Sequence, residues 1–538
     1  MYTANPLSNP LSNSVPSYSY DDVPYPSHPY QATHPDHIYS LARVFKFDAK
    51  IPDDSTVLEL GCASGGNLIP MAVQIPTAKF IGVDLSSKQI EEGRATIQSL
   101  GLKNIQLLDI NFDDINESFG QFDYILCHGV FSWVPPNAQK RILEICRDRL
   151  SPKGVAYISY NAYPGWFMRG MIREMMLHHI KKLSDPKQKI GQARALLAFL
   201  VASTEGQTTP YAQCLKEELD LLSKHSDAYL FHDHLEENNH PMFFYQFMEM
   251  AKEHGLQFMS ETNLSGMITS NLPPKASEAL TKLTNDVHHR SQYTDFVTNR
   301  MFRQSLLCRS EHVLSRHLDE SRFEDARFVG NFQIDSSNGT MDITPTVEVI
   351  FKCPNGRTIR TSNAPLKAMM YELNTAFPAS LSLAEISSGI EKRLSQTLVV
   401  GEQDQIRIPK VCASNLVQLI VRGDIDFRFP KDRFTVSVAE RPRLSGLSRL
   451  QSRAGGNVTT QRHGMITPDA MTRLVMQILD GTRNKQDLRE YIADLVSSGK
   501  LKVNVQGEQK VDMVKVYDAT VDKILEQMRR QGLLVAGD

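Results

Sequence analysis

Short apolar runs alternate with amphipathic stretches through the first third of the chain. Five runs of strand length cover residues 57–60, 80–84, 104–109, 122–128 and 155–160. The stretches between them have the spacing of helices that bury one face. Strands that alternate with such helices predict an α/β fold, built on a doubly wound, Rossmann-like parallel sheet.

One helix between these strands carries signals at both ends. It is expected over residues 86–100, where Ser86 or Ser87 can accept hydrogen bonds from the free N–H groups of the first turn. Gly101 follows the last turn and can adopt the left-handed conformation that ends many helices. These signals place the helix between the second and third strands.

After residue 160 the pattern changes several times. A helix over residues 241–254 that stops at Gly255, followed by a strand over residues 256–260, is expected to complete the sheet. Asn355-Gly356 between two apolar runs predicts a hairpin. The pattern divides the chain into a flexible N-terminal arm (1–32), a core (33–166 plus about 240–270), a helical insertion (167–239), a helical connector (271–330), a winged-helix-like middle domain (331–434), a linker (435–462) and a C-terminal winged-helix-like domain (463–538) that ends in a strand over 532–535.

Length and composition are those of a globular protein with several domains. A chain of 538 residues is too long for one hydrophobic core. The net charge of -2 gives no field that favours nucleic acid or an anionic membrane, so neither partner is expected. The polar N-terminus lacks the apolar core of a signal peptide, and no apolar run reaches membrane-spanning length. Seven separate cysteines suit a reducing compartment, and we expect a cytoplasmic protein.

The turn after the first strand is built from small residues. Residues 59–66 read Glu-Leu-Gly-Cys-Ala-Ser-Gly-Gly, so a ligand can approach the backbone closely. The N–H groups of this turn and of the following helix can hold an anionic or polar group. Asp84, at the tip of the second strand, can accept hydrogen bonds from both ribose hydroxyls of a nucleoside cofactor. Asp109, at the tip of the third strand, is placed to meet an adenine amino group.

Two kinds of nucleoside cofactor fit this arrangement. The spacing of residues 61–66 is a degenerate form of the dinucleotide fingerprint, which alone is a weak signal. The order of the strands, the acid at Asp84 and the Pro-x-Gly turn at residues 152–154 resemble a class I S-adenosylmethionine-dependent methyltransferase. The resemblance implies S-adenosylmethionine as the cofactor. The expected cofactor contacts are Tyr25, Glu59, Gly61, Cys62, Ala63, Gly65, Asn67, Asp84, Leu85, Asp109, Ile110 and His128.

The loops after the fourth and fifth strands are aromatic, and a methyl acceptor must reach this edge of the sheet. Each loop carries one of the two tryptophans of the chain, Trp133 and Trp166. An aromatic slot suits an alkylammonium or alkylamine, although the same residues can instead anchor the loops on the insertion. His128 is either a base or a wall beside the adenine. The expected acceptor-side and catalytic residues are His128, Trp133, Tyr160, Tyr163 and Trp166.

Two further features leave alternatives open or predict an absence. Residues 20–30 place aromatic residues and histidines between prolines, so this segment is stiff and extended. It either covers the cofactor or packs on the core as a linker. The histidines at 178–179 and 232–234 lack a convincing third ligand, so no metal site is expected.

Several longer stretches carry a more specific resemblance. They are residues 24–26, 33–35, 58–71, 128–135, 160–166, 229–232 and 303–309, and less strictly 479–483. Together they are similar to one bacterial family, the methyltransferases that carry a methyltransferase regulatory domain. This family includes rickettsial protein-lysine methyltransferases that modify outer-membrane surface proteins. The resemblance implies an N-methyltransferase acting on lysine side chains of a bacterial outer-membrane or surface protein.

The size of the chain bears on the acceptor. A protein-lysine methyltransferase would use the insertion and the C-terminal units to form a wide cleft for a chain segment, and a homodimer would use them too. A small-molecule methyltransferase and a non-catalytic protein that binds S-adenosylmethionine are the alternatives. Methyl-lysine in an exported protein would distinguish the first function from the other two.

Overall fold

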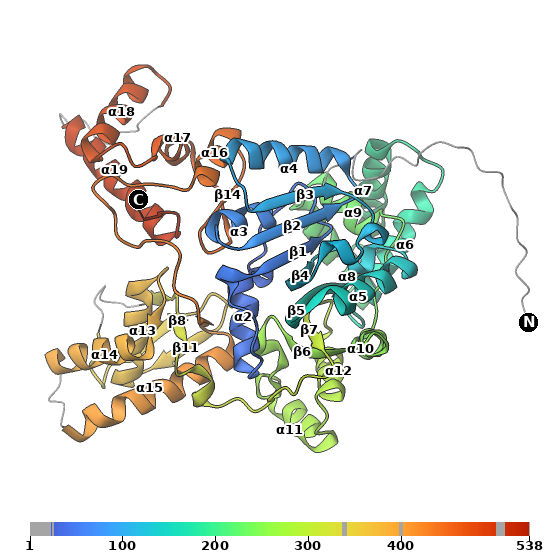
Figure 1. Cartoon of the computed structure of the whole chain (residues 1–538), viewed down its shortest axis with the longest axis horizontal. Coiled ribbons are helices and arrows are strands. Elements are labelled where there is room, and N and C mark those ends of the chain that lie inside the picture. Colours follow the sequence, from blue (N-terminus) through green and yellow to red (C-terminus); the bar gives the residue numbers. More distant parts are fainter. Residues whose placement is uncertain (1–22, 24–25, 336–341, 398–401, 502–511, 537–538) are drawn as a thin grey trace, which may run out of the picture.

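A seven-stranded sheet lies at the centre of the molecule, in the strand order β3-β2-β1-β4-β5-β7-β6 (Figure 1). The computed structural model describes residue 23 and residues 26–335, 342–397, 402–501 and 512–536. β1 to β5 are parallel, whereas β7 runs antiparallel to both of its neighbours. The strands are β1 (Thr56–Leu60), β2 (Lys79–Asp84), β3 (Ile105–Asp109), β4 (Phe122–Cys127), β5 (Leu150–Asn161), β6 (Leu256–Glu261) and β7 (Phe302–Arg309). The predicted doubly wound α/β core is confirmed.

Both faces of this sheet are buried. Val57 of β1 belongs to one hydrophobic cluster and Leu58 to a second, because successive side chains of a strand point to opposite faces. Helices cover both faces, as is typical of parallel sheets. They are α2 (Pro35–Val44), α3 (Leu68–Gln74), α4 (Ser87–Leu100), α5 (Pro136–Arg149) and α10 (Phe244–Glu253).

Two of these helices show how far local signals set helix ends. In α4 the Ser86 side chain accepts a hydrogen bond from the backbone N–H of Gln89, and Gly101 ends the helix with a φ of +66°. Both ends agree with the prediction. α10 begins at Phe244 rather than at residue 241, and Gly255 follows it with a φ of +67°.

The prediction of a helical connector over residues 271–330 is wrong in its second half. Two helices, α11 (Pro274–Leu283) and α12 (Val287–Thr298), occupy the first half. The chain then forms β7, which inserts between β5 and β6 and completes the sheet. The polar residues near the start of β7 do not follow the pattern of a buried strand, and this concealed it.

Arg303 explains how β7 can be both polar and buried. Its side chain is 2% exposed, and its guanidinium donates to Asp295 Oδ2 at 2.8 Å and to Glu261 Oε1 at 2.6 Å. Its Cζ also lies 3.8 Å from the centre of the Phe244 ring. Although burial acts to raise it, the pKa of Glu261 is held below its usual value by the neighbouring arginines. A buried charge is tolerated when it is paired and hydrogen-bonded in this way.

The helical insertion lies beside the sheet (Figure 1). Its helices are α6 (Trp166–Ile180), α7 (Pro186–Ser203), α8 (Pro210–Ser223) and α9 (Asp227–His234). Their apolar sides form a separate hydrophobic cluster that includes Ile172, Leu197 and Leu230. The insertion is therefore a unit with its own core.

The middle unit combines three helices with two three-stranded sheets. Asn355-Gly356 forms the expected hairpin turn, with Gly356 at a φ of +81° between two antiparallel strands. The elements are β8 (Arg327–Val329), β9 (Gln333–Asp335), β10 (Val349–Lys352), β11 (Thr358–Thr361), α13 (Ala364–Ala376), β12 (Leu381–Ser382), α14 (Leu383–Thr397), α15 (Glu402–Arg422) and β13 (Asp426–Arg428). The sheets have the orders β11-β10-β9 and β12-β8-β13.

The segment predicted as a linker over residues 435–462 is folded, which corrects that prediction. It contains α16 (Gly446–Ala454), in which Leu447 is buried whereas Arg453 is exposed. The arginine-rich composition concealed an amphipathic helix. The remaining elements of this unit are β14 (Val458–Thr459), β15 (Met465–Ile466), α17 (Ala470–Ile478), α18 (Lys485–Ser497) and α19 (Met513–Arg530). The strand predicted over residues 532–535 is reduced to a single bridge at Leu534.

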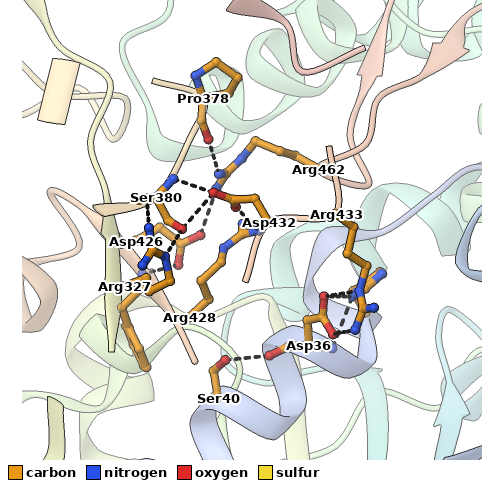
Figure 2. A network of polar contacts seen from close by, with 12 residues as sticks. Asp36, Ser40, Arg327, Pro378, Ser380, Asp426, Arg428, Asp432, Arg433 and Arg462 are labelled. Carbon is orange, nitrogen blue, oxygen red and sulfur yellow. Dashed lines mark hydrogen bonds and ion pairs between the residues drawn. The ribbon is translucent and has the colours of Figure 1, made fainter. Parts of the chain in front are cut away.

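Arginines join the C-terminal half to the core (Figure 2). Arg433 donates to Asp36 of α2, with Nη2 and Oδ1 3.0 Å apart, and to Asp53, with Nη1 and Oδ1 2.7 Å apart. Arg462, in the loop between β14 and β15, lies 3.4 Å from a carboxylate oxygen of Asp426. The C-terminal unit therefore contacts the middle unit beside the point where the chain is tied to α2. Among the described residues, no helix has both the length and the apolar character needed to cross a membrane.

Candidate functional site

The turn after β1 has the close-approach geometry that its small residues predict. Gly61 and Ala63 have φ values of +75° and +49°. A Cβ at Gly61 would lie 2.4 Å from Val130 Cγ2, so a larger residue does not fit there. The N–H of Ala63 donates to Asp84 Oδ2 at 2.8 Å, and the N–H of Ser86 donates to Asp84 Oδ1 at 3.0 Å. These bonds orient the Asp84 carboxylate beside the turn.

A cavity of about 620 Å³ opens at this edge of the sheet. Its lining includes most of the residues that the sequence nominates at both ends of the site. They are Glu59, Gly61, Cys62, Ala63, Asn67, Asp84, Leu85, His128, Trp133 and Trp166. The expected cofactor end and the expected acceptor end therefore belong to one continuous space.

Some of the expected residues lie elsewhere. Gly65, Asp109, Ile110, Tyr160 and Tyr163 are absent from the described lining of this cavity, and Tyr25 lies outside the described residues. The Asp109 carboxylate is exposed and accepts a hydrogen bond from Ser87 Oγ at 3.1 Å. It therefore turns toward the start of α4 rather than into the cavity.

The two tyrosines expected on the acceptor side are also misplaced. Tyr160 is 1% exposed and stacks on Phe247 with ring centres 4.2 Å apart. β5 continues to Asn161, so Tyr160 is still inside the sheet and packs in its core. Tyr163 stacks on the exposed ring of Phe167 at 4.0 Å, and neither ring is part of the described lining of the cavity. Neither tyrosine is placed to contact an acceptor.

His128 forms a wall of the cavity. The Tyr157 hydroxyl oxygen accepts a hydrogen bond from Gln304 Nε2 at 3.0 Å, so its single hydrogen is available to His128 Nδ1 at 2.7 Å. The ring of Tyr30 also packs against His128, with the two ring centres 3.8 Å apart. Burial lowers the pKa of His128 to about 4. The ring is therefore neutral near pH 7, and the wall role is the one that these ring contacts support.

Glu59 is a buried carboxyl group with one unsatisfied oxygen. Oε1 accepts a hydrogen bond from Asn67 Nδ2 at 2.6 Å, whereas Oε2 is buried and has no partner among the described residues. Burial raises the pKa of Glu59 to about 8. An unpaired buried acceptor costs about 1–3 kcal/mol. The cavity therefore calls for a donor at this point, and the amino group of S-adenosylmethionine fits that requirement.

The N-terminal arm lies over the glycine-rich turn, which corrects its description as flexible for the part that the structure describes. The N–H of Gly66 donates to Ser27 Oγ at 2.7 Å, and a Cβ at Gly66 would lie only 2.4 Å from the carbonyl oxygen of Ser27. The Val23 carbonyl lies 2.5 Å from His232 Nε2 of α9. Of the two roles considered for the arm, covering the cofactor site is the one that these contacts support.

The part of the cavity lined by Trp133 and Trp166 is aromatic. Trp133 and Trp166 form an edge-to-face pair with ring centres 5.9 Å apart and planes at 77°. Arg169 lies over the Trp166 ring, with its Cζ 5.6 Å from the ring centre. The Arg169 charge is paired with Glu218, whose Oε1 lies 3.0 Å from Nε. The charge of this cation is therefore balanced by a carboxylate of α8.

Two residues with carboxyl side chains also line the cavity. Asp233 of α9 and Glu236, just beyond it, both line the cavity. Burial raises the pKa of Asp233 above its usual value. Burial, together with the charges of Glu59 and Asp233, also raises the pKa of Tyr30 to about 12. The cavity is thus lined by acidic as well as aromatic side chains.

Three groups of lining residues are among those missing from the expected site residues. They are Ser27 and Tyr30 of the arm, Asn111, Phe112 and Asp113 after β3, and Asp233 and Glu236 of the insertion. A signal existed for the second group, because loops at the carboxyl ends of parallel strands line ligand sites. A signal existed for the third group too, because Asp233 directly follows the family stretch over residues 229–232.

This combination of fold and site defines a class of enzyme. A seven-stranded sheet with a reversed β7, a left-handed small-residue turn after β1 and an oriented acid after β2 is the arrangement of a class I S-adenosylmethionine-dependent methyltransferase. Three family models match the chain accordingly. They are a methyltransferase domain over residues 58–156, a predicted methyltransferase regulatory domain over residues 226–309 and a PKMT C-terminal winged helix domain over residues 440–533.

Relatives match along almost the whole chain. An uncharacterized protein of Rickettsia prowazekii is 36% identical over 524 residues, which cover 96% of this chain and 93% of that protein. The structure of PKMT2 from Rickettsia typhi is 30% identical and covers 95% of this chain and 100% of its own, with a TM-score of 0.86. The same protein in complex with AdoHcy gives 31% identity and a TM-score of 0.85. The chain belongs to the family of class I methyltransferases that includes rickettsial PKMT2, and S-adenosylmethionine is its cofactor.

Proposed function

We propose that this methyltransferase modifies the ε-amine of lysine side chains in a bacterial outer-membrane or surface protein, in the cytoplasm before export. One observation carries the proposal: two tryptophans, Trp133 and Trp166, and two carboxylates, Asp233 and Glu236, line the same cavity. Aromatic faces and carboxylates both attract an alkylammonium. Lysine carries such a charge on a flexible four-carbon stem that an aromatic slot can enclose.

Another part of the cavity would hold S-adenosylmethionine, which supplies a methyl group on a positively charged sulfur. Glu59 offers its free oxygen to the amino group of the cofactor. Asp84, oriented by two backbone N–H groups, offers its carboxylate to the ribose hydroxyls. Phe112 and Asp113 line the cavity beyond Asp84, and we assign them the adenine contact in place of Asp109.

The acceptor amine must lose a proton before it can act as a nucleophile. The tryptophan walls exclude water, and desolvation lowers the pKa of an amine. The Asp233 carboxylate lines the same cavity as both tryptophans, so it is available to accept a proton from the ammonium group. We therefore assign Asp233 the task of holding the ammonium group and taking its proton. Positioning of the amine supplies much of the remaining rate.

Further observations support a protein acceptor in the cytoplasm. PKMT2 matches 95% of this chain, and the C-terminal unit matches a PKMT winged helix domain. The acceptor wall is built partly by the insertion, which a small acceptor would not require. All seven cysteines are buried and free of disulfide bonds, as suits a reducing compartment.

Isotope transfer followed by mass spectrometry tests the proposal. The purified protein is incubated with S-adenosylmethionine that carries a deuterated methyl group and with a bacterial lysate. We expect the label on lysine side chains of cell-envelope proteins. Trp166→Ala and Asp233→Asn should each reduce labelling roughly tenfold or more, whereas Tyr163→Phe, outside the cavity, should leave it unchanged.

The alternatives give different results in the same assay. Label that appears only in small molecules refutes a protein acceptor and supports the small-molecule enzyme. S-adenosylhomocysteine binding without transfer to any acceptor refutes an enzyme. Label on envelope proteins that is unaffected by Trp166→Ala and Asp233→Asn would mean that the acceptor enters elsewhere.

A further inference from the structure

His463, a residue of the C-terminal unit, contacts a residue that lines the cavity. His463 lies in the loop between β14 and β15 and is 1% exposed. Its Nε2 lies 2.8 Å from Oδ1 of Asn67, the residue that precedes the first turn of α3. Asn67 lines the cavity and follows the glycine-rich turn directly. His463 therefore contacts the end of this turn although it lies 396 positions further along the chain.

The loop holds His463 in an uncommon backbone conformation. Its φ is +57°, in the left-handed region that few residues other than glycine adopt. The N–H of Thr460 donates to the carbonyl oxygen of Gly464 at 2.9 Å and closes the turn. Arg462 ties the same loop to Asp426 of the middle unit (Figure 2). Backbone strain of this kind persists only where the surrounding structure enforces it.

The orientation of the Asn67 amide is fixed by its partners. Its Oδ1 accepts a hydrogen bond from the backbone N–H of Tyr30 at 2.9 Å, and a backbone N–H can only donate. The amide therefore cannot be flipped, and Nδ2 faces Glu59 Oε1 at 2.6 Å. Because Oδ1 can only accept, His463 must donate from Nε2. Burial and the neighbouring His34 keep the pKa of His463 well below its usual value, so the ring is neutral.

Glu59 stands at the end of this chain of hydrogen bonds. Asn67 Nδ2 is the donor on Oε1, and Oε2 is buried with no partner in the described parts of the chain. The direction in which Glu59 presents Oε2 to the cavity therefore depends on the position of Asn67. The Asn67 amide oxygen in turn meets the N–H of Tyr30, the hydroxyl of Thr33 at 3.1 Å and the ring of His463.

We propose that His463 is a positioning residue of the cofactor site, which acts through Asn67 to aim Glu59 at the amino-acid end of S-adenosylmethionine. The C-terminal unit is then a part of the cofactor site and not an appendage. This role concerns cofactor binding, so its test does not depend on the identity of the methyl acceptor.

Calorimetric binding of two ligands tests this role. S-adenosylhomocysteine carries the amino-acid end of the cofactor, and 5′-methylthioadenosine lacks it. His463→Leu removes the donor while keeping an apolar side chain of similar size, and His463→Gln restores an N–H donor. We expect His463→Leu to weaken S-adenosylhomocysteine binding about tenfold and to leave 5′-methylthioadenosine binding unchanged. His463→Gln should recover most of the lost affinity.

Each other result overturns the proposal. Equal weakening of both ligands would show that His463 only supports the fold, and unchanged binding of both would show that the contact has no role. A second measurement uses Glu59→Gln as the background. There, His463→Leu should cost no further affinity for S-adenosylhomocysteine, because the two residues act in series. Additive losses would exclude a path through Glu59. Asn457→Ala, an exposed position before β14, serves as the matched control and should change neither affinity.

Discussion

Substitution of Glu59 by glutamine should move stability and cofactor binding in opposite directions. The variant keeps the size of the side chain and an oxygen that can accept from Asn67 Nδ2. It removes the ability to ionise. In the wild type, burial raises the pKa of Glu59 from its ordinary value of 4.5 to about 8. The folded protein therefore binds this proton more tightly than the unfolded chain does.

The size of the stability effect follows from this shift. Below pH 4.5 Glu59 is neutral in both states and folding carries no penalty. As the pH rises from 4.5 toward 8, the unfolded chain ionises and the folded protein does not, so wild-type stability falls by about 1.4 kcal/mol per pH unit. The loss reaches about 3 kcal/mol at pH 7 and levels off above pH 8. Glu59→Gln does not carry this penalty.

Thermal unfolding of the ligand-free proteins from pH 5 to 9 measures the effect. The Tm of Glu59→Gln should rise relative to that of the wild type as the pH increases to about 8, and the difference should then level off. A Tm difference that is constant with pH would refute the environment assigned to Glu59. Conditions must be matched in salt and buffer, because other carboxylates titrate in both proteins.

Binding should change in the opposite sense. The variant loses a charge-assisted hydrogen bond to the cofactor amino group, worth about 1.5–3 kcal/mol, or roughly 10- to 150-fold in the Kd of S-adenosylhomocysteine. Pairing with an ammonium group also favours the ionised form of Glu59, so the wild type should release up to about one proton on binding at pH 7. Calorimetry in buffers of different ionisation enthalpy counts that proton. Release of the same number by Glu59→Gln would assign it to another group.

Three other substitutions test separate parts of the structure. Asp84→Ala should weaken S-adenosylhomocysteine binding by about 2–3 kcal/mol in calorimetry, and an unchanged Kd would mean that the site is misplaced. Gly66→Ala places a Cβ 2.4 Å from the Ser27 carbonyl oxygen, so the arm should be displaced and the chain should be cleaved faster by chymotrypsin after Tyr30. Unchanged cleavage would show that the arm does not depend on this contact. Arg303→Met leaves Glu261 buried without its main partner and should lower the stability by about 3–5 kcal/mol, seen as a lower Tm. A Tm equal to that of the wild type would show that β7 does not need this ion pair.

The parts of the fold that the sequence predicts are those with local signals. Each strand from β1 to β5 is a short apolar run, and α4 has a serine at its start and a glycine at its end. The turn over residues 59–66 is recognisable because it needs small residues for steric reasons that act within a few positions. Asp84 is predictable for the same reason, since it stands at the tip of a strand next to that turn.

The parts that escaped prediction depend on partners far away in the sequence. Arg303 makes β7 polar. The burial of its charge is stabilised by Glu261 and Asp295, which belong to other elements. Asp233 lies on a helix of the insertion and becomes a site residue only because the insertion folds over the cavity. The prediction that Tyr160 contacts the acceptor is wrong for a local reason. The strand continues to residue 161, so it buries a side chain that a loop would expose.

The cofactor site itself is assembled from distant segments. The methyltransferase family model covers residues 58–156 and includes Glu59, Asn67 and Asp84. Yet the backbone N–H of Tyr30, from the arm, and the ring of His463, from the C-terminal unit, both meet the same amide oxygen of Asn67. A carboxyl group that must be buried to meet an amino group needs its orientation fixed by other atoms, because water cannot do so there. The segments outside the family model therefore supply contacts that the glycine-rich turn lacks. They hold Asn67, and Asn67 holds the Glu59 carboxyl group.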